Sequence, residues 1–150
     1  MKQVVRVKVL ADAQQLDAVV RTLAVCNDTA TLVARIAHER RVFRRRDLRA
    51  ITYATAREHG GLGAQVAQSV IRKVADSYTS LRANLRNGRY GPKGSRRRAR
   101  VENLPIRFRP DAAQPFDDRC LSYADIVGSH NIAHRAAEDY RAQSTVPGAA

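Results

Sequence analysis

The residues with the clearest chemical potential are arginines, which gather in two short stretches. The first places six guanidiniums within ten residues, at Arg40, Arg41, Arg44, Arg45, Arg46 and Arg49. The second holds seven cations and no acid, at Arg86, Arg89, Lys93, Arg96, Arg97, Arg98 and Arg100. A guanidinium is a planar fork that meets two phosphate oxygens at once, so these stretches favour contact with a phosphate backbone. A solvated helix end or loop is the simpler interpretation, but like charges at this density repel one another without a partner.

The distribution of charge along the chain also indicates a polyanionic partner. The 150 residues carry a formal net charge of +13. Residues 1–103 contain 22 Lys and Arg against 8 Asp and Glu, whereas residues 104–150 contain 5 against 6. We therefore expect nucleic acid, RNA or DNA, as the partner, and we add Arg72 and Lys73 to the predicted binding surface. The sequence shows no membrane-binding pattern and no signal peptide, so we expect a cytoplasmic protein without membrane contact.

The other reactive side chains form no recognisable catalytic pattern. Cys26 and Cys120 do not make a Cys-x-x-Cys pair and are interpreted as buried, reduced thiols. His130 and His134 have the i, i+4 spacing of a metal pair, but no glutamate base lies between them and no third ligand is evident. We expect no metal site and no cofactor. Tyr90, inside the second arginine stretch, either stacks on a base or packs at the foot of a loop.

Two segments with a strand pattern flank the part of the chain that contains the arginines. Residues 104–123 predict a hairpin, because Ile106 and Phe108 alternate with arginines and prolines punctuate the turn. Val4–Leu10 predicts a second strand region. We expect these segments to pair in a small antiparallel sheet. With helices between them and a helix at the C-terminus, the predicted fold class is α+β.

Helical patterns fill the chain between these strands. Asp12 is predicted to cap a first helix, the pair Asn27-Asp28 to break it and cap a second, and Asp47 to cap a third that Gly60-Gly61 closes. The strongest pattern runs from Gly63 to Arg86 and predicts one helix. Its predicted core stripe consists of Val66, Val70, Val74, Tyr78, Leu81 and Leu85. Arg72, Lys73 and Arg82 are predicted to face outward, and residues 86–103 to form a basic loop.

Three stretches carry a resemblance to a known family: Gly61–Val74, Tyr78–Asn84 and Phe108–Ser122. They resemble segments of actinobacterial TnpB (OrfB) proteins, transposon-encoded, RNA-guided relatives of the miniature type V CRISPR nucleases. The resemblance covers residues 1–123. It implies a wedge-like domain with a helical recognition insertion at about 12–86. In that family this half helps to hold the guide RNA–DNA hybrid and reads a short DNA motif beside the target.

The segment after Tyr123 resembles the end of the TnpB nuclease domain. Asp125, Asn131 and Ile132 match its pattern, while Val127 stands where the family has Asn. In the family that aspartate is the last of three carboxylates in a RuvC-type site that binds Mg²⁺. Most of this domain and its zinc ribbon are missing here, and one carboxylate cannot organise two hard cations. The resemblance thus implies no catalytic residue in this chain. We expect residues 124–142 to be a remnant of the C-terminal helix of the nuclease domain, with Asp125 as its cap. We expect residues 143–150 to form a disordered tail.

These features together predict a truncated, transposase-like protein that binds RNA or DNA through an arginine surface. As a single chain we expect it to be inactive as a nuclease and not to be an enzyme. Three alternatives stay open: a nuclease-dead repressor or RNA-binding module, a subunit whose site a partner chain completes, and a non-functional remnant of a transposon gene. The sequence leaves the oligomeric state undecided.

Overall fold

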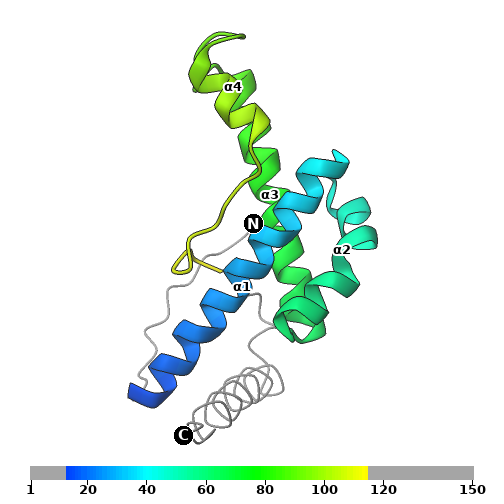
Figure 1. Ribbon diagram of the computed structural model, residues 1–150, viewed down its shortest axis with the longest axis vertical. Coiled ribbons are helices and arrows are strands. Elements are labelled where there is room, and N and C mark those ends of the chain that lie inside the picture. The colour runs from blue at the N-terminus through cyan, green and yellow to red at the C-terminus, as the bar shows by residue number, and fades with distance from the viewer. Residues whose placement is uncertain (1–12, 115–150) are drawn as a thin grey trace, which may run out of the picture.

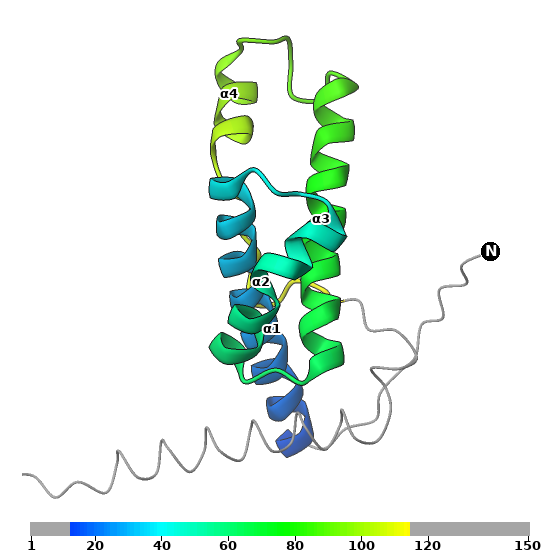
Figure 2. The ribbon, with the colours of Figure 1, turned by 90° about the vertical axis from the view of Figure 1, so that its right-hand side faces the viewer.

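The computed structural model describes residues 13–114, which form a helical bundle with one appended hairpin (Figure 1). Helices α1 (Ala13–Arg40), α2 (Arg45–Gly60) and α3 (Ala64–Arg86) all pack against one another. Helix α4 (Arg96–Asn103) lies beside the C-terminal half of α3 (Figure 2). Residues 104–112, here called the strap, then run back along α1 and α3. The predictions for Val4–Leu10, the second half of the hairpin, Asp125 and the last helix lie outside the described residues.

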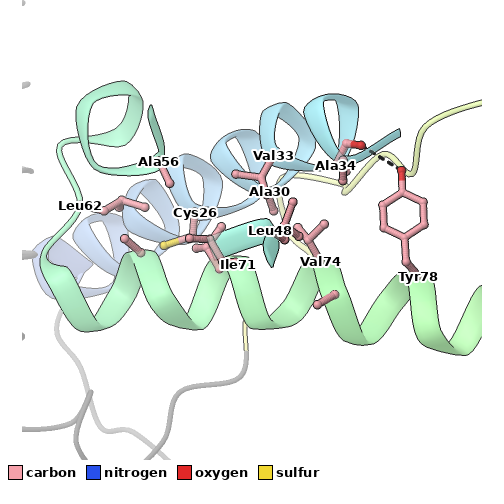
Figure 3. Packing of buried hydrophobic residues seen from close by; sticks show 14 residues of the cluster. Cys26, Ala30, Val33, Ala34, Leu48, Ala56, Leu62, Ile71, Val74 and Tyr78 are labelled. Carbon is pink, nitrogen blue, oxygen red and sulfur yellow. Dashed lines mark hydrogen bonds between the residues drawn. The ribbon is translucent and has the colours of Figure 1, made fainter. Parts of the chain in front are cut away.

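The core is built from small and branched side chains between three helices (Figure 3). α1 contributes Cys26, Ala30, Val33, Ala34 and Ala37, α2 contributes Leu48 and Ala56, and α3 contributes Val70, Ile71, Val74 and Tyr78. Alanines at these contacts let the helix backbones approach closely, and the larger side chains of α3 fill the space that they leave. The predicted stripe of α3 is confirmed from Val66 to Leu81 as the core-facing side of one continuous helix, whereas Leu85 lies beyond the core cluster.

Three helices end with the same backbone motif, in which a residue just beyond the helix adopts a left-handed conformation. Gly61 directly follows α2 with φ 58°, and Gly88 is the second residue after α3 with φ 72°. The corresponding residue after α1 is Arg41, with φ 56°, the one non-glycine residue of 13–114 with positive φ. In each case the next residue donates its N–H to a carbonyl five residues back, at 3.0 to 3.2 Å. The predicted glycine stop of α2 is therefore confirmed, and Arg41 is the exception.

The predicted α+β fold is wrong for the part of the chain that the structure describes, which has helices and no strand. Ile106 and Phe108 do alternate with exposed arginines, because one side of the strap packs on the core. Side chains of the helices take the place of a partner strand. The N–H of Ile106 donates to the Tyr78 hydroxyl at 3.5 Å, and that of Phe108 to Oγ1 of Thr31 at 3.1 Å. The period-2 pattern thus reflects an extended strap on helices.

Three predicted helix boundaries also differ from the structure. α1 continues through Asn27 and Asp28, because the Asn27 side chain is buried and bonded to the strap instead of capping a helix. Asp47 is not a cap: α2 begins at Arg45, and Asp47 lies in its first turn, where a carboxylate still favours the helix dipole. The predicted basic loop contains α4, which begins after Ser95, whose Oγ accepts the N–H of Arg98 at 3.4 Å.

Candidate nucleic-acid interface

The first arginine stretch forms the turn between α1 and α2, here called the arginine corner. It consists of Arg40, Arg41, Arg44, Arg45, Arg46 and Arg49. All six side chains are exposed, and none forms an ion pair with a carboxylate of residues 13–114. The guanidinium of Arg49 lies over the ring of Tyr53 at 5.6 Å from its centroid. The corner therefore presents cations whose charge no acidic side chain of the described region neutralises.

The arginine corner is attached to α3 through a contact between two tilted aromatic rings. Phe43, in the turn, lies against Tyr78 of α3 with ring centroids 4.7 Å apart. The guanidinium of Arg82, one helical turn further along α3, lies over Phe43 at 4.3 Å. This cation–π contact holds an exposed arginine of α3 beside the corner. It also confirms that Arg82 is on the surface.

The second arginine stretch covers the end of α3, the connecting turn and α4, here called the α3–α4 hairpin. Its exposed cations are Arg86, Arg89, Lys93, Arg96, Arg97 and Arg100. Arg98 differs, since it is half-buried and its Nε donates to Glu102 at 2.9 Å. The guanidinium of Arg97 lies 5.8 Å from the ring centroid of Tyr90. Six of the seven predicted cations are thus available to a partner, and the seventh is paired within α4.

The two groups of cations belong to one surface. Arg82, which borders the corner, stands four residues before Arg86, which opens the hairpin, and four residues span about 6 Å along a helix. Both views of the ribbon place the α1–α2 turn and α4 toward the same end of the bundle, where α3 terminates (Figures 1 and 2). Arg82 and Arg86 of α3 therefore lie between the corner and the hairpin, and the corner, these two residues and the hairpin are here called the basic surface.

Lys73 is not part of that surface, and the prediction that it faces outward is wrong. Its side chain is 8% exposed, and its ammonium donates to Oδ1 of Asn27 and lies 4.9 Å from the ring centroid of Phe108. Desolvation lowers the pKa of the ammonium from its ordinary value. Arg72, also predicted to bind nucleic acid, is half-buried. Lys73 instead holds the strap in place.

Asn27 completes this buried polar contact. Its Nδ2 donates to the carbonyl oxygens of Pro110 and Ala112, both at 2.8 Å, while its Oδ1 accepts from Lys73. One amide therefore satisfies a buried cation and two carbonyls of the strap, as buried polar groups require. Sequence reasoning missed both residues. The available signal was that Lys73 lies between the core positions Val70 and Val74, and that Asn27 follows the buried Cys26.

A groove between α3 and α4 was not foreseen from the sequence. Its volume is about 670 Å³. A separate hollow of about 800 Å³ lies between α1 and the strap. The α3–α4 groove is lined by Asp76, Ser80 and Asn84 of α3, by Arg100 and Val101 of α4, and by Tyr90. The separate hollow contains the pair of His59 and Asp28, 2.7 Å apart. Of these two hollows, the α3–α4 groove is the one that combines an aromatic ring, the Asn84 amide and residues of the basic hairpin.

The described residues show neither a cluster of metal-ligand type nor a helix that could cross a membrane. Within 13–114 no three side chains of His, Cys, Asp and Glu come together. Asp125, His130 and His134 fall outside that range. No helix among the described residues has the length and apolar character that a membrane span requires.

Comparison with known proteins gives no family for this chain. No protein-family model, no curated protein and no solved structure matches it. The resemblance to TnpB proteins therefore stays a prediction from the quoted sequence stretches.

Proposed function

We propose that this protein binds nucleic acid through the basic surface formed by the arginine corner and the α3–α4 hairpin. The observation that supports the proposal most directly is the absence of ion pairs between the corner arginines and any carboxylate of residues 13–114. Several exposed guanidiniums without acidic partners repel one another, and a row of phosphates relieves that repulsion. Backbone contacts of this kind give affinity and position without reading sequence.

The resemblance to TnpB proteins suggests the form of the ligand. In an RNA-guided complex the protein follows the backbone and shape of a hybrid, while base pairing reads the sequence. A surface dominated by arginine suits that task, because each guanidinium can bind one phosphate in two places. We therefore propose a guide-type RNA, alone or paired with DNA, as the partner, and no cleavage by this chain alone.

The test is the salt dependence of binding, measured by fluorescence anisotropy with a labelled RNA. Arg96→Ala/Arg97→Ala removes two exposed cations of α4, so the slope of log affinity against log salt should flatten by about 1.4 to 1.8. A matched control is Arg21→Ala/Arg109→Ala, which removes the same charge from arginines paired with Asp17 and Asp111. The control should leave the slope nearly unchanged. Equal slopes for both double variants would contradict the proposed surface.

The absence of cleavage has a separate test. The purified chain with a guide RNA and target DNA should give no product in Mg²⁺ or Mn²⁺, because one carboxylate cannot hold the two ions of a RuvC-type site. Asp125→Ala should leave RNA affinity unchanged. Guide-dependent cutting that Asp125→Ala abolishes would overturn this part of the proposal and favour an active nuclease.

A further inference from the structure

The groove between α3 and α4 has the size and lining of a small-ligand site placed inside the basic hairpin. Its volume of about 670 Å³ lies in the usual range for such sites. Apolar walls come from Leu81, Val101 and Ile106, and polar groups from Ser80, Asn84 and Arg100. Arg100 of the hairpin lines the groove and can bind a phosphate, while the carboxylate of Asp76 also borders it. Nucleic acid that reaches α4 therefore also reaches this groove.

Tyr90 provides an aromatic wall on a well-defined turn. The N–H of Gly91 donates to the carbonyl of Gly88 at 3.0 Å, which closes a turn with Tyr90 as its third residue. The hydroxyl of Ser95 donates to the carbonyl of Tyr90 at 3.4 Å. Both flanking glycines have positive φ, a conformation in which glycine is favoured. The backbone thus fixes the position of Tyr90, whose ring borders the groove and has the Arg97 guanidinium over one face at 5.8 Å from its centroid.

Asn84 supplies hydrogen-bonding groups in the same groove. Its side chain is half-buried, and its amide makes no hydrogen bond with any residue of 13–114. Its backbone carbonyl accepts from the N–H of Arg89 at 3.0 Å. Its side-chain amide borders the groove, where a ligand can reach it. An asparagine amide offers a donor and an acceptor side by side, the pattern that matches N7 and N6 of adenine.

We propose that this groove binds one unstacked base of a single-stranded nucleic acid, with adenine preferred. The base stacks on Tyr90, its edge bonds to Asn84, and its phosphate lies at Arg100. The inference rests on the proposed function, because the hairpin must first bring nucleic acid to the groove. It adds that the hairpin reads an unpaired base, whereas the corner contacts backbone only. A base inside a duplex cannot enter, so the groove distinguishes single strands from duplexes.

The test compares three dye-labelled ligands by anisotropy: a ten-nucleotide oligo-adenylate, the same length of oligo-uridylate, and a ten-base-pair duplex. Tyr90→Ala should weaken binding of oligo-adenylate by roughly 5- to 150-fold, the effect of removing a base-stacking ring. Duplex affinity should change less than twofold. Tyr90→Phe keeps the ring and should bind like the unaltered protein. Asn84→Ala should abolish the preference for oligo-adenylate over oligo-uridylate.

The outcomes separate this inference from the proposed function. An equal loss for oligo-adenylate and duplex in Tyr90→Ala would contradict the groove but leave the salt-slope result for Arg96 and Arg97 standing. If no ligand binds the unaltered protein, both proposals fail. Circular dichroism establishes whether each variant is folded. Should Tyr90→Ala unfold, Asn84→Ala decides, since alanine is favoured at this helical position. An unchanged base preference in that variant would overturn the inference.

Discussion

Replacing Arg41 by glycine should stabilise the protein and weaken its binding of nucleic acid at the same time. Arg41 ends α1 with φ 56°, whereas glycine occupies the same position after α2 and α3. A left-handed conformation costs a non-glycine residue about 1–2 kcal/mol. Glycine also has greater conformational freedom in the unfolded chain, which lowers the stability gained from relieving this strain by roughly 0.5–1 kcal/mol. The net expected gain in the free energy of unfolding for Arg41→Gly is therefore about 0.5–1 kcal/mol.

The chain offers two matched comparisons for this magnitude. Arg41→Ala removes the same guanidinium but keeps a side chain in the left-handed conformation, so its stability should stay within about 0.5 kcal/mol of the unaltered protein. Gly61→Ala introduces the same strain after α2. A Cβ on Gly61 would meet no heavy atom within 4 Å. Any loss in the free energy of unfolding therefore measures the cost of the left-handed backbone conformation without a steric clash. That loss should be about as large as the gain from Arg41→Gly.

Thermal unfolding followed by circular dichroism measures these differences. For a domain of this size the expected gain for Arg41→Gly corresponds to roughly 2–8 °C in Tm. Both Arg41 variants should lose one phosphate contact and flatten the salt slope by about 0.7–0.9. Equal stability of Arg41→Gly and Arg41→Ala would refute the strain argument. Unchanged salt slopes in both would show that Arg41 occupies its strained position without contacting phosphate.

Two further predictions concern the buried contact beneath the strap. Asn27→Ala should lower the free energy of unfolding by about 3 kcal/mol, because it leaves the Lys73 ammonium and two strap carbonyls without a partner. Urea denaturation at neutral pH measures this loss. The double variant Asn27→Ala/Lys73→Met should recover part of it, because it also removes the buried ammonium. Stability should also rise with pH between the lowered pKa of Lys73 and its ordinary value of 10.5, because the unfolded chain binds more protons than the folded one in that interval. Denaturation at stepwise pH values should show the rise, and Lys73→Met should remove it. Above pH 10 the raised pKa of the Tyr78 hydroxyl, which burial causes, acts in the opposite direction. A variant with Lys73→Met that keeps the full rise would assign the titration to another group.

The sequence predicted well those elements whose pattern is set by one helix alone. The stripe from Val66 to Leu85 is long and regular, so α3 was predicted almost to the residue. The stop after α2 was predicted because Gly61 has the conformation that favours glycine. The exposed arginines were identified as exposed because guanidiniums at this density have no room in a core of this size.

The strap could not be predicted, because its pattern has two physical origins. Alternation of Ile106 and Phe108 with arginines shows only that one side is buried; it does not say whether a strand or a helix pair covers the backbone. The structure uses hydroxyls of Tyr78 and Thr31 to satisfy the strap N–H groups. Lys73 is buried because the strap covers the side of α3 that carries it, and without the strap that side would face water. An error about one element thus became an error about a site residue.

The aromatic residues of this protein give the arginine surface a rigidity that the charge count alone does not convey. Three rings each lie beneath one guanidinium, in the pairs Arg49 with Tyr53, Arg82 with Phe43, and Arg97 with Tyr90. A free arginine loses about 2 kcal/mol of rotamer entropy when it is immobilised on a ligand. A guanidinium already held on a ring has lost part of that freedom before binding, so more of each phosphate contact remains as affinity. Because Phe43 also contacts the ring of Tyr78, whose hydroxyl bonds to the strap and to the backbone of α1, the pair of Arg82 and Phe43 is fixed to the core itself.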